Sequence, residues 1–292
     1  DSAGYIYCTG IDAVPALFAW NAGYPGFAAL GLGPTPPSQL IDEPGGAHGR
    51  ENQGRAGTGD PTMYFPDGNA TITRLLVRGL IPGAISGSSM EDVVLADTDY
   101  GRLDTADSAV RIRLNSTVVN VRHMGSPDSA DSVEVTYVRD GQARRVRGGA
   151  VVLACWNGVI PYLCPEMPET QREALSYGVK APLVYTNVLL RNWESLVASG
   201  VSGASAPGGY HQSMSLATSL DFGGYRTSQD PTEPIVLRMS RYPFEPGQSK
   251  AEQHRRGRRD LLSTSFETFE IKIRDQLART FGPKGFDPER DI

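Results

Sequence analysis

The residues best suited to bring main chain close to a ligand lie in the run FPDGNATITRLLVRGLIPG, residues 65–83. Gly68 and Asn69 come directly before a short apolar stretch with helical spacing, and that stretch ends at Pro82-Gly83. Glycine has no Cβ and permits a positive φ angle, so main chain at Gly68 can approach a flat ligand closely. The N–H groups at a helix start also attract electron-rich ligand atoms. The alternative is an ordinary turn in which Asn69 caps the helix.

A second segment of interest is the run from Ala150 to Cys155, AVVLAC, which is apolar throughout. A continuous apolar run of this length predicts a strand buried on both faces, as in a parallel sheet. It leads into Trp156. Flavin and nucleotide folds bring main chain close to the cofactor where such strands end. We expect Cys155 to be a small buried apolar residue.

Several common catalytic and cofactor-binding motifs are absent from the sequence. It has no HExxH motif or Cys/His cluster for a metal, and no G-x-S-x-G motif for a serine nucleophile. Gly31-Leu32-Gly33 and Gly57-Thr58-Gly59 both lack the third glycine of a dinucleotide fingerprint. We expect structural or solvated roles for the four isolated histidines, with His48 in a glycine-rich loop as the best exception.

The composition is that of an ordinary globular protein of 292 residues with a mild negative charge. The net charge is −5 and the pI is near 5.5, which argues against nucleic acid as a partner. We expect the one basic run, His254 to Arg259, to be the solvated start of a helix. No apolar run reaches the ~18 residues of a membrane-spanning helix, so we expect no transmembrane segment.

The order of the predicted elements indicates a mixed α/β (α+β) fold. A glycine-rich loop is expected at 42–62, and Asp140-Gly141 predicts a hairpin turn. From Asp260 onward, apolar residues recur every three or four positions until Gly282-Pro283, which predicts a helix. Alternation or apolar character predicts further strands at 110–121, 133–137, 145–147, 181–190 and 235–239.

Four long motifs follow one another along the chain: FPDGNATITRLLVRGLIPG, VRIRLNSTVVNVRH, VVLACWNGVIPYLCPEMP and YGVKAPLVYTNVLLRNW. In this order they resemble the spermidine dehydrogenases, a branch of the flavin-containing amine oxidase superfamily. The likeness continues through FETFEIKIRDQLARTFGPKGFDPERDI and covers roughly residues 61–292.

The resemblance implies an FAD-binding, amine-oxidase-like two-domain fold. One part would hold FAD along an extended groove, and the other would cover the flavin ring with a mostly antiparallel sheet. The implied reaction is oxidation of a polyamine such as spermidine, in which hydride leaves the carbon beside nitrogen for the flavin and the imine hydrolyses. Some members also carry haem b and pass electrons to an external acceptor.

The resemblance also implies cofactor contacts. Gly68 with its neighbour matches a Gly-Gly pair near the flavin, and Val118 matches a position whose main chain pairs with the adenine of FAD. Trp156 could line the site or could simply pack in the fold. The cofactor-binding candidates are Gly68, Asn69, Val118, Ala154, Cys155 and Trp156.

Two residues are catalytic candidates. Many amine oxidases hold a lysine, through one water, near the reactive nitrogen of the flavin. Lys180 is one candidate for this role, and its alternative is a solvated loop lysine. Alignment of Val184-Tyr185-Thr186 with the family's strand instead puts Asn187 at the usual position of the lysine. Asn187 would position a water but would supply no charge.

Relatives begin with a strand–GxGxxG–helix unit and end with a second flavin-contacting segment, and this sequence shows neither. We therefore expect an interior, incomplete portion whose partners include the remaining N- and C-terminal parts. Residues 1–62 would be a loop region of the substrate domain, 63–164 part of the FAD-binding domain, and 165–292 the substrate-binding domain. The alternatives are a superfamily member acting on an amino acid or a polyene, and a non-catalytic binding or assembly subunit.

Overall fold

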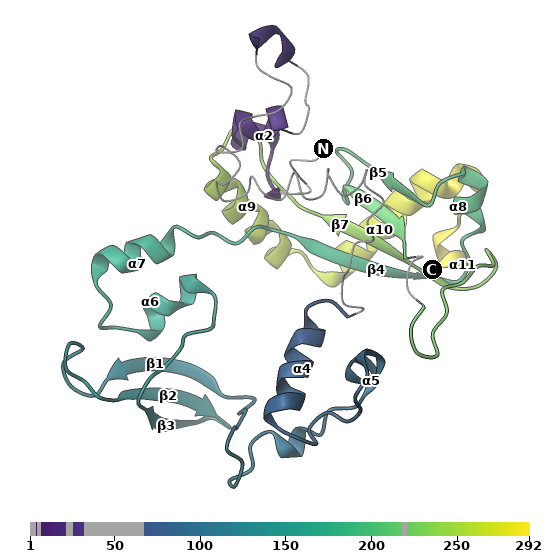
Figure 1. Cartoon of the computed structure of the whole chain (residues 1–292). Coiled ribbons are helices and arrows are strands. Elements are labelled where there is room, and N and C mark those ends of the chain that lie inside the picture. Colours follow the sequence, from purple (N-terminus) through teal and green to yellow (C-terminus); the bar gives the residue numbers. More distant parts are fainter. Residues whose placement is uncertain (1–3, 5–6, 22–25, 32–66, 218–220) are drawn as a thin grey trace. The chain divides into compact units, whose positions relative to one another are not determined.

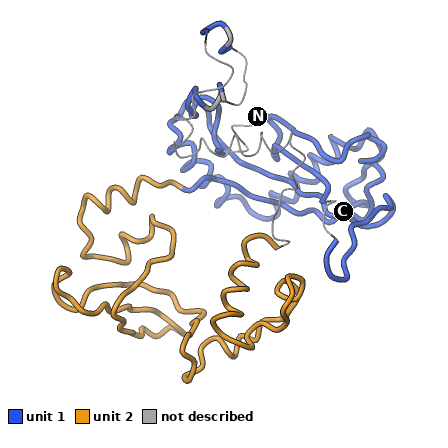
Figure 2. Tube along the Cα trace, in the orientation of Figure 1, with its two compact units in different colours: residues 1–64, 180–292 blue, residues 65–179 orange. Residues whose placement is uncertain are grey.

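The computed structural model describes residues 4, 7–21, 26–31, 67–217 and 221–292 (Figure 1). The chain divides into two compact units, of which unit 1 comprises residues 1–64 and 180–292 and unit 2 comprises residues 65–179 (Figure 2). The functions predicted for the three sequence segments stay predictions. The loop predicted at 42–62 and His48 lie outside the described residues. Helices and two antiparallel sheets make the fold mixed α/β, as the sequence predicts.

Unit 2 contains one three-stranded antiparallel sheet with the strand order β1-β2-β3. Asp140 and Gly141 join β2 to β3 with positive φ angles of 52° and 71°, which confirms the predicted hairpin turn. The elements of unit 2 are α4 (Ala70–Leu80), α5 (Met90–Leu95), β1 (Thr117–His123), β2 (Val133–Arg139), β3 (Gln142–Gly148), α6 (Ile160–Leu163) and α7 (Glu169–Ser176), with short 3₁₀ helices at Tyr100–Arg102 and Asn157–Val159.

The strand predicted from residue 110 begins only at Thr117. The preceding residues form no strand pair. Val110 and Ile112 pack against the buried cluster of Ile81, Ala84 and Leu103, whereas Leu114, also predicted on this side, is exposed. Arg113, on the opposite side, binds Asp104 with its Nε at 2.9 Å from the carboxylate. The segment is therefore held by side-chain contacts and by one main-chain hydrogen bond, from the N–H of Ile112 to the carbonyl oxygen of Leu103 at 2.6 Å, without a partner strand.

The strand predicted at 150–155 is wrong. The structure forms no strand in this run, Val152 is 88% exposed, and Cys155, expected to be buried, is exposed. An apolar run becomes a strand only when its N–H and C=O groups find a partner strand. The described sheet of unit 2 ends at β1 and β3, and the run pairs with neither. The parallel pairing that the run suggests is thus not seen among the described strands.

Unit 1 is built around a four-stranded antiparallel sheet with the strand order β4-β7-β6-β5. The strands predicted at 181–190 and 235–239 correspond to β4 and β7. The elements of unit 1 are α2 (Ala16–Asn21), β4 (Val184–Leu190), α8 (Glu194–Ser199), β5 (Gly203–Ser205), β6 (Ser213–Leu216), β7 (Ile235–Arg241), α9 (Lys250–Ser263), α10 (Phe266–Phe281) and α11 (Pro288–Asp291), with 3₁₀ helices at Ile11–Ala13, Ala28–Leu30 and Gly282–Lys284.

The core of unit 1 lies between α10 and one face of this sheet (Figure 1). Leu237 of β7 and Leu277 of α10 are fully buried there, and Phe281 is 1% exposed. The single helix predicted from Asp260 is two helices, because Ser265 accepts the N–H of Thr268 at 3.2 Å and starts α10 anew. The apolar face of α10 alone therefore covers the sheet.

The basic run from His254 to Arg259 lies inside α9, which corrects its prediction as a helix start. The helix begins earlier because Ser249 caps it through the N–H of Glu252. His254 is buried, and its Nε2 lies 2.8 Å from the carbonyl oxygen of Tyr7. Arg256 binds the carboxylates of Glu252 and Glu245. Most of the run, namely His254, Arg255, Arg256 and Arg259, is thus paired within unit 1.

Replacing Gly257 with alanine should destabilise unit 1 by about 1–3 kcal/mol, through overpacking. A Cβ at Gly257 would collide with the carbonyl oxygen of Pro243 and lie 2.7 Å from Cγ of Pro182. Gly79 in α4 is the matched control, since a Cβ there would meet nothing within 4 Å. Its alanine variant should stabilise unit 2 by about 0.5–1 kcal/mol. Thermal unfolding measures both, and equal effects would contradict the packing of α9.

Candidate active site

The two faces of the unit 1 sheet differ in character. In β7, Leu237 and Met239 are fully buried against the core, whereas Arg238 between them is exposed. In β4, Val188 faces the core and Asn187 is exposed. Because successive side chains of a strand point to opposite faces, the residues that alternate with the core residues form the outer face.

Strand register places the outer-face residues in two rows across three strands. Asn187 of β4 pairs with Arg238 of β7, and Arg238 pairs with Ser215 of β6. The neighbouring row joins Tyr185 and Ser213 through a central serine of β7. Directly paired residues on one face have Cβ atoms about 4.5–5.5 Å apart, so each row acts as one surface.

These rows line a cavity of about 450 Å³. Its volume falls within the range of small-molecule sites, roughly 300–1,000 Å³. We call it the sheet-face cavity, and its lining residues are Tyr185, Asn187, Ser213, Ser215, Arg238 and Ser240.

Arg238 is the only charged residue in this lining. Within the described part of the chain, its guanidinium has no hydrogen-bond or ion-pair partner. The polar ends of the Tyr185, Asn187 and Ser215 side chains likewise have none among the described residues. The cavity thus combines one fixed positive charge with neutral donors and acceptors that are free to bind a ligand.

The donors of this cavity suit an anionic group. A guanidinium presents forked N–H groups that match the two oxygens of a carboxylate. An ammonium group about 4 Å from Arg238 would be repelled by about 1 kcal/mol in water, and by about 4 kcal/mol at an effective dielectric near 20. Among the lining side chains, the amide of Asn187 can position a water or a ligand, but none is a strong base.

A second cavity of unit 1, of about 610 Å³, lies beside the sheet edge between β4 and α10. Phe266, Phe269 and Ile273 of α10 give it a mostly apolar lining, and β4 supplies the other wall. It adjoins the sheet-face cavity, since Tyr185 and Asn187 contribute to both. Apolar parts of a ligand bound beside Arg238 could extend along this edge.

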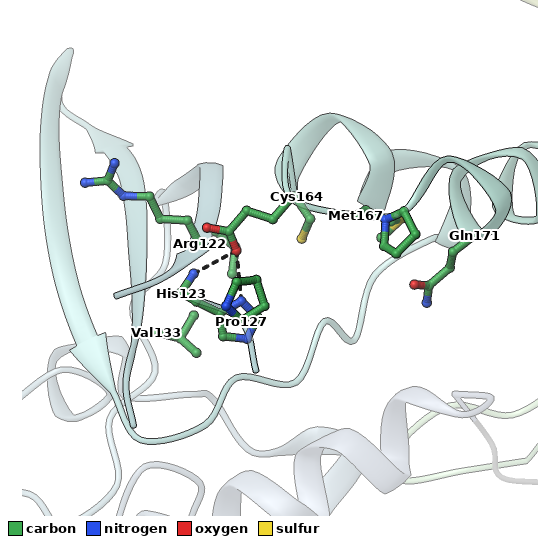
Figure 3. Close-up of a pocket in the computed structure, with 10 residues that line it drawn as sticks. Arg122, His123, Pro127, Val133, Cys164, Met167 and Gln171 are labelled. Carbon is green, nitrogen blue, oxygen red and sulfur yellow. Dashed lines mark hydrogen bonds and ion pairs between the residues drawn. The ribbon is translucent and has the colours of Figure 1, made fainter. Parts of the chain in front are cut away.

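A cavity of about 250 Å³ in unit 2 contains a histidine–carboxylate pair (Figure 3). Glu166 accepts the main-chain N–H of His123 at 3.0 Å and lies 2.8 Å from its Nδ1, and these hydrogen bonds lower the pKa of Glu166. Burial raises the pKa of Cys164 on the same wall, so its thiol is protonated at neutral pH. The pair fastens the segment before α7 to the end of β1.

Gly68 lies in the turn before α4 with a φ angle of 70°, a conformation that favours glycine. A Cβ there would meet nothing within 4 Å among the described residues. Glycine is therefore favoured at this position by the positive φ angle and not by a crowded neighbour. Asn69 is the N-cap by position only, because its side chain makes no capping hydrogen bond. Thr71 instead donates its hydroxyl to Asp67. The cofactor role of Gly68 and Asn69 stays a prediction.

The other cofactor candidates lie elsewhere in unit 2. Val118 is in β1, which is an edge of the described sheet, and it precedes a register irregularity opposite β2. Ala154 and Cys155 are exposed in the irregular run, and Trp156 is 43% exposed. No described main-chain hydrogen bond joins Val118, Ala154 or Cys155 to Gly68. Their contact with FAD stays a prediction.

The two catalytic candidates differ in their position within unit 1. Lys180 is exposed in the connection before β4 and does not line the sheet-face cavity, whereas Asn187 does. Sequence reasoning missed Arg238, which lies directly across from Asn187. The available signal was a single charged residue inside the otherwise apolar run from Ile235 to Met239.

The described residues do not fit haem or a metal ion. Each described histidine is engaged within the protein, His123 by Glu166, His211 by Thr186 and His254 by the carbonyl of Tyr7. No group of three or more described His, Cys, Asp or Glu side chains could hold a metal. Among the described helices, none has the length and apolar character needed to cross a bilayer.

No model of a known protein family matches the sequence. No curated protein matches it either. The structure is similar to solved structures of putrescine oxidase. The wild-type enzyme bound to putrescine aligns with a TM-score of 0.39 and 18% identity, over 61% of this chain and 33% of that chain. A triple mutant from a redesign of cofactor binding aligns with a TM-score of 0.40, 18% identity and the same coverage. The chain thus spans about a third of the length of these structures.

Proposed function

We propose that this chain is part of an enzyme that oxidises an amine with FAD. The observation that carries the proposal is the sheet-face cavity, which places the catalytic candidate Asn187 beside the unpartnered Arg238 in a space fit for a small substrate. The sequence resemblance supports the same reaction, hydride transfer from the carbon beside nitrogen followed by imine hydrolysis. The resemblance adds an external electron acceptor and the remaining parts of the enzyme, and it names a spermidine-like molecule as the first candidate for the substrate.

FAD, when bound, supplies the acceptor for the hydride. Gly68, Val118 and the segment from Ala154 to Trp156 would hold it through main chain. All of these positions are exposed, and a Cβ at Gly68 would meet open space, so the described residues leave room for such a ligand. Asn187 would position a water or the substrate, as its place in the cavity suggests.

A second candidate for the substrate is an amino acid. Arg238 favours it, because a guanidinium binds a carboxylate and repels the ammonium groups of a polyamine. The third interpretation, a non-catalytic binding or assembly subunit, keeps the same cavity without any redox chemistry.

The full-length protein that contains this chain should be yellow, with a flavin absorption band at about 450 nm. Addition of an amine substrate without oxygen should bleach that band, because hydride passes to the flavin. Spermidine tests the polyamine substrate in this assay, and L-ornithine tests the amino acid. A colourless protein that FAD does not reconstitute would support the binding subunit and contradict amine oxidation.

Gly68 offers a sharper test with a matched control. Gly68→Val should lower FAD affinity at least about tenfold, since a β-branched residue strains at positive φ and adds bulk beside the ligand. Gly141→Val introduces the same strain, at a φ of 71°, in the hairpin of the same unit. It should leave FAD affinity unchanged. An equal loss in both variants would show a folding defect and remove the support for Gly68.

A further inference from the structure

The sheet-face cavity contains a fixed positive charge that amine oxidation does not by itself require. Arg238 follows Leu237 and precedes Met239, and both neighbours are fully buried under α10. Their burial fixes the main chain of β7 and its register. The Arg238 side chain must therefore emerge on the outer face, in the middle of the sheet and away from its ends.

No acidic group neutralises this charge within the described residues. The cross-strand neighbours of Arg238 are Asn187 and Ser215, both neutral, and the next row of the lining is neutral as well. Several other strand arginines are paired: Arg122 binds Glu134, and Arg241 of β7 itself binds Asp260 at 2.7 Å. An unpaired arginine surrounded by neutral hydrogen-bonding groups indicates a place for an anionic ligand.

The neutral neighbours add donors on both sides of the guanidinium. The amide of Asn187 lies in one flanking strand and the hydroxyl of Ser215 in the other. A carboxylate bound to Arg238 can accept further hydrogen bonds from both, since an ionised carboxylate has about four acceptor positions. The arrangement thus offers bidentate recognition with lateral support.

We propose that Arg238, with Asn187 and Ser215, binds the carboxylate of the substrate, so that the substrate is an α-amino acid instead of a polyamine. This assignment rests on the proposed amine oxidation and names its substrate class. The cavity of about 450 Å³ holds one amino acid head group, and the groove beside β4, whose lining includes Glu270 among mostly apolar side chains, receives the methylene groups of the substrate side chain. The site has one positive charge and neutral donors. It therefore matches the single negative charge of a carboxylate better than the two negative charges of a phosphate.

Equilibrium binding of a matched ligand pair tests the assignment. L-Ornithine and putrescine differ by one carboxylate. Calorimetry on the full-length protein, with any flavin reduced beforehand and oxygen excluded, measures both without turnover because a reduced flavin accepts no hydride. We expect L-ornithine to bind at least about tenfold more tightly than putrescine, since hydrogen bonds between charged partners are the strong ones. Inorganic phosphate, titrated in parallel, should bind more weakly than L-ornithine.

Three variants locate the effect. Arg238→Gln should weaken L-ornithine binding at least about tenfold and leave putrescine unchanged or tighter. Arg238→Lys keeps the charge without the fork and should recover part of the affinity. Arg144→Gln is the matched control, because Arg144 is also an exposed strand arginine without a partner among the described residues, and it lies in β3 of unit 2. Arg144→Gln should leave the affinity for both ligands unchanged.

Four results would overturn the assignment: putrescine binding as tightly as L-ornithine, phosphate binding more tightly than L-ornithine, unchanged L-ornithine binding in Arg238→Gln, or no binding of either amine. The flavin measurement stays separate. If the protein is colourless but still binds L-ornithine more tightly through Arg238, the proposed redox function is wrong and the carboxylate site is supported. A flavin-bearing protein with no such preference keeps amine oxidation and loses the site.

Discussion

Replacing Phe281 with alanine should lower the free energy of unfolding of unit 1 by about 3–5 kcal/mol, the largest effect we expect from one core substitution. Phe281 is the last residue of α10 and is 1% exposed. Its ring lies in an edge-to-face arrangement with Phe286, with centroids 6.4 Å apart, and it shares the core with Leu196 and Leu277. Truncation removes buried apolar area and leaves a cavity where α10 closes over the sheet.

Phe266 is the matched control for Phe281. It is the first residue of the same helix, and it is 83% exposed. Phe266→Ala should therefore change stability by no more than about 0.5 kcal/mol. Urea denaturation followed by circular dichroism measures both variants. Similar losses in the two variants would mean that α10 does not pack on the sheet as described.

Acidification from pH 6.5 to about 4 should destabilise unit 1 by about 3 kcal/mol through His211. His211 is fully buried, its Nε2 lies 3.3 Å from Oγ1 of Thr186, and its Nδ1 has no partner in the described structure. Burial, together with the charge of Arg241, lowers the pKa of His211 from 6.5 to about 4. Between pH 6.5 and about 4, His211 is protonated in the unfolded chain but stays neutral in the folded chain. The free energy of unfolding therefore falls as the pH falls through this range.

Denaturant unfolding measured between pH 4 and 7 tests this linkage. His211→Phe removes the titrating group, so its stability should depend much less on pH even if its stability at pH 7 changes. A smaller slope should remain, because burial also lowers the pKa of His254. The hydrogen bond with Arg290 lowers the pKa of Asp291 to about 2. Asp291 therefore contributes to the pH dependence of stability only below about pH 4. If the free energy of unfolding of His211→Phe depended on pH as steeply as that of the unchanged protein, the proposal that His211 is buried as a neutral imidazole would be wrong.

Local signals in the sequence predicted several elements well. Gly68 and the apolar spacing after it predicted α4, and the turn at Asp140-Gly141 formed as predicted. These elements depend on contacts within a few residues, namely a turn conformation, a helix start and side-chain alternation. Their local physics is the same in the short segment and in the folded chain.

Signals that need a distant partner were less reliable. The run from Ala150 to Cys155 has the composition of a buried strand, yet a strand is defined by its ladder partner and the described unit provides none. The helix predicted through Thr264 breaks there because Ser265 caps a new helix, a local choice that apolar spacing does not reveal. For the helix the apolar pattern was interpreted correctly, but for the run from Ala150 to Cys155 the predicted burial was wrong together with the predicted strand, since Val152 and Cys155 are exposed.

The sequence by itself determined the mixed α/β class, the hairpin and the main strands, because composition and periodicity encode which residues are buried. The candidacy of Asn187 came from the family resemblance alone. Only the tertiary structure decided that Asn187 stands beside Arg238 and Ser215, and that this row has no acidic neighbour among the described residues. These residues come from three strands far apart in the chain. Strand order and register bring them together, and both are set by how the whole sheet packs on α10, which no local pattern specifies.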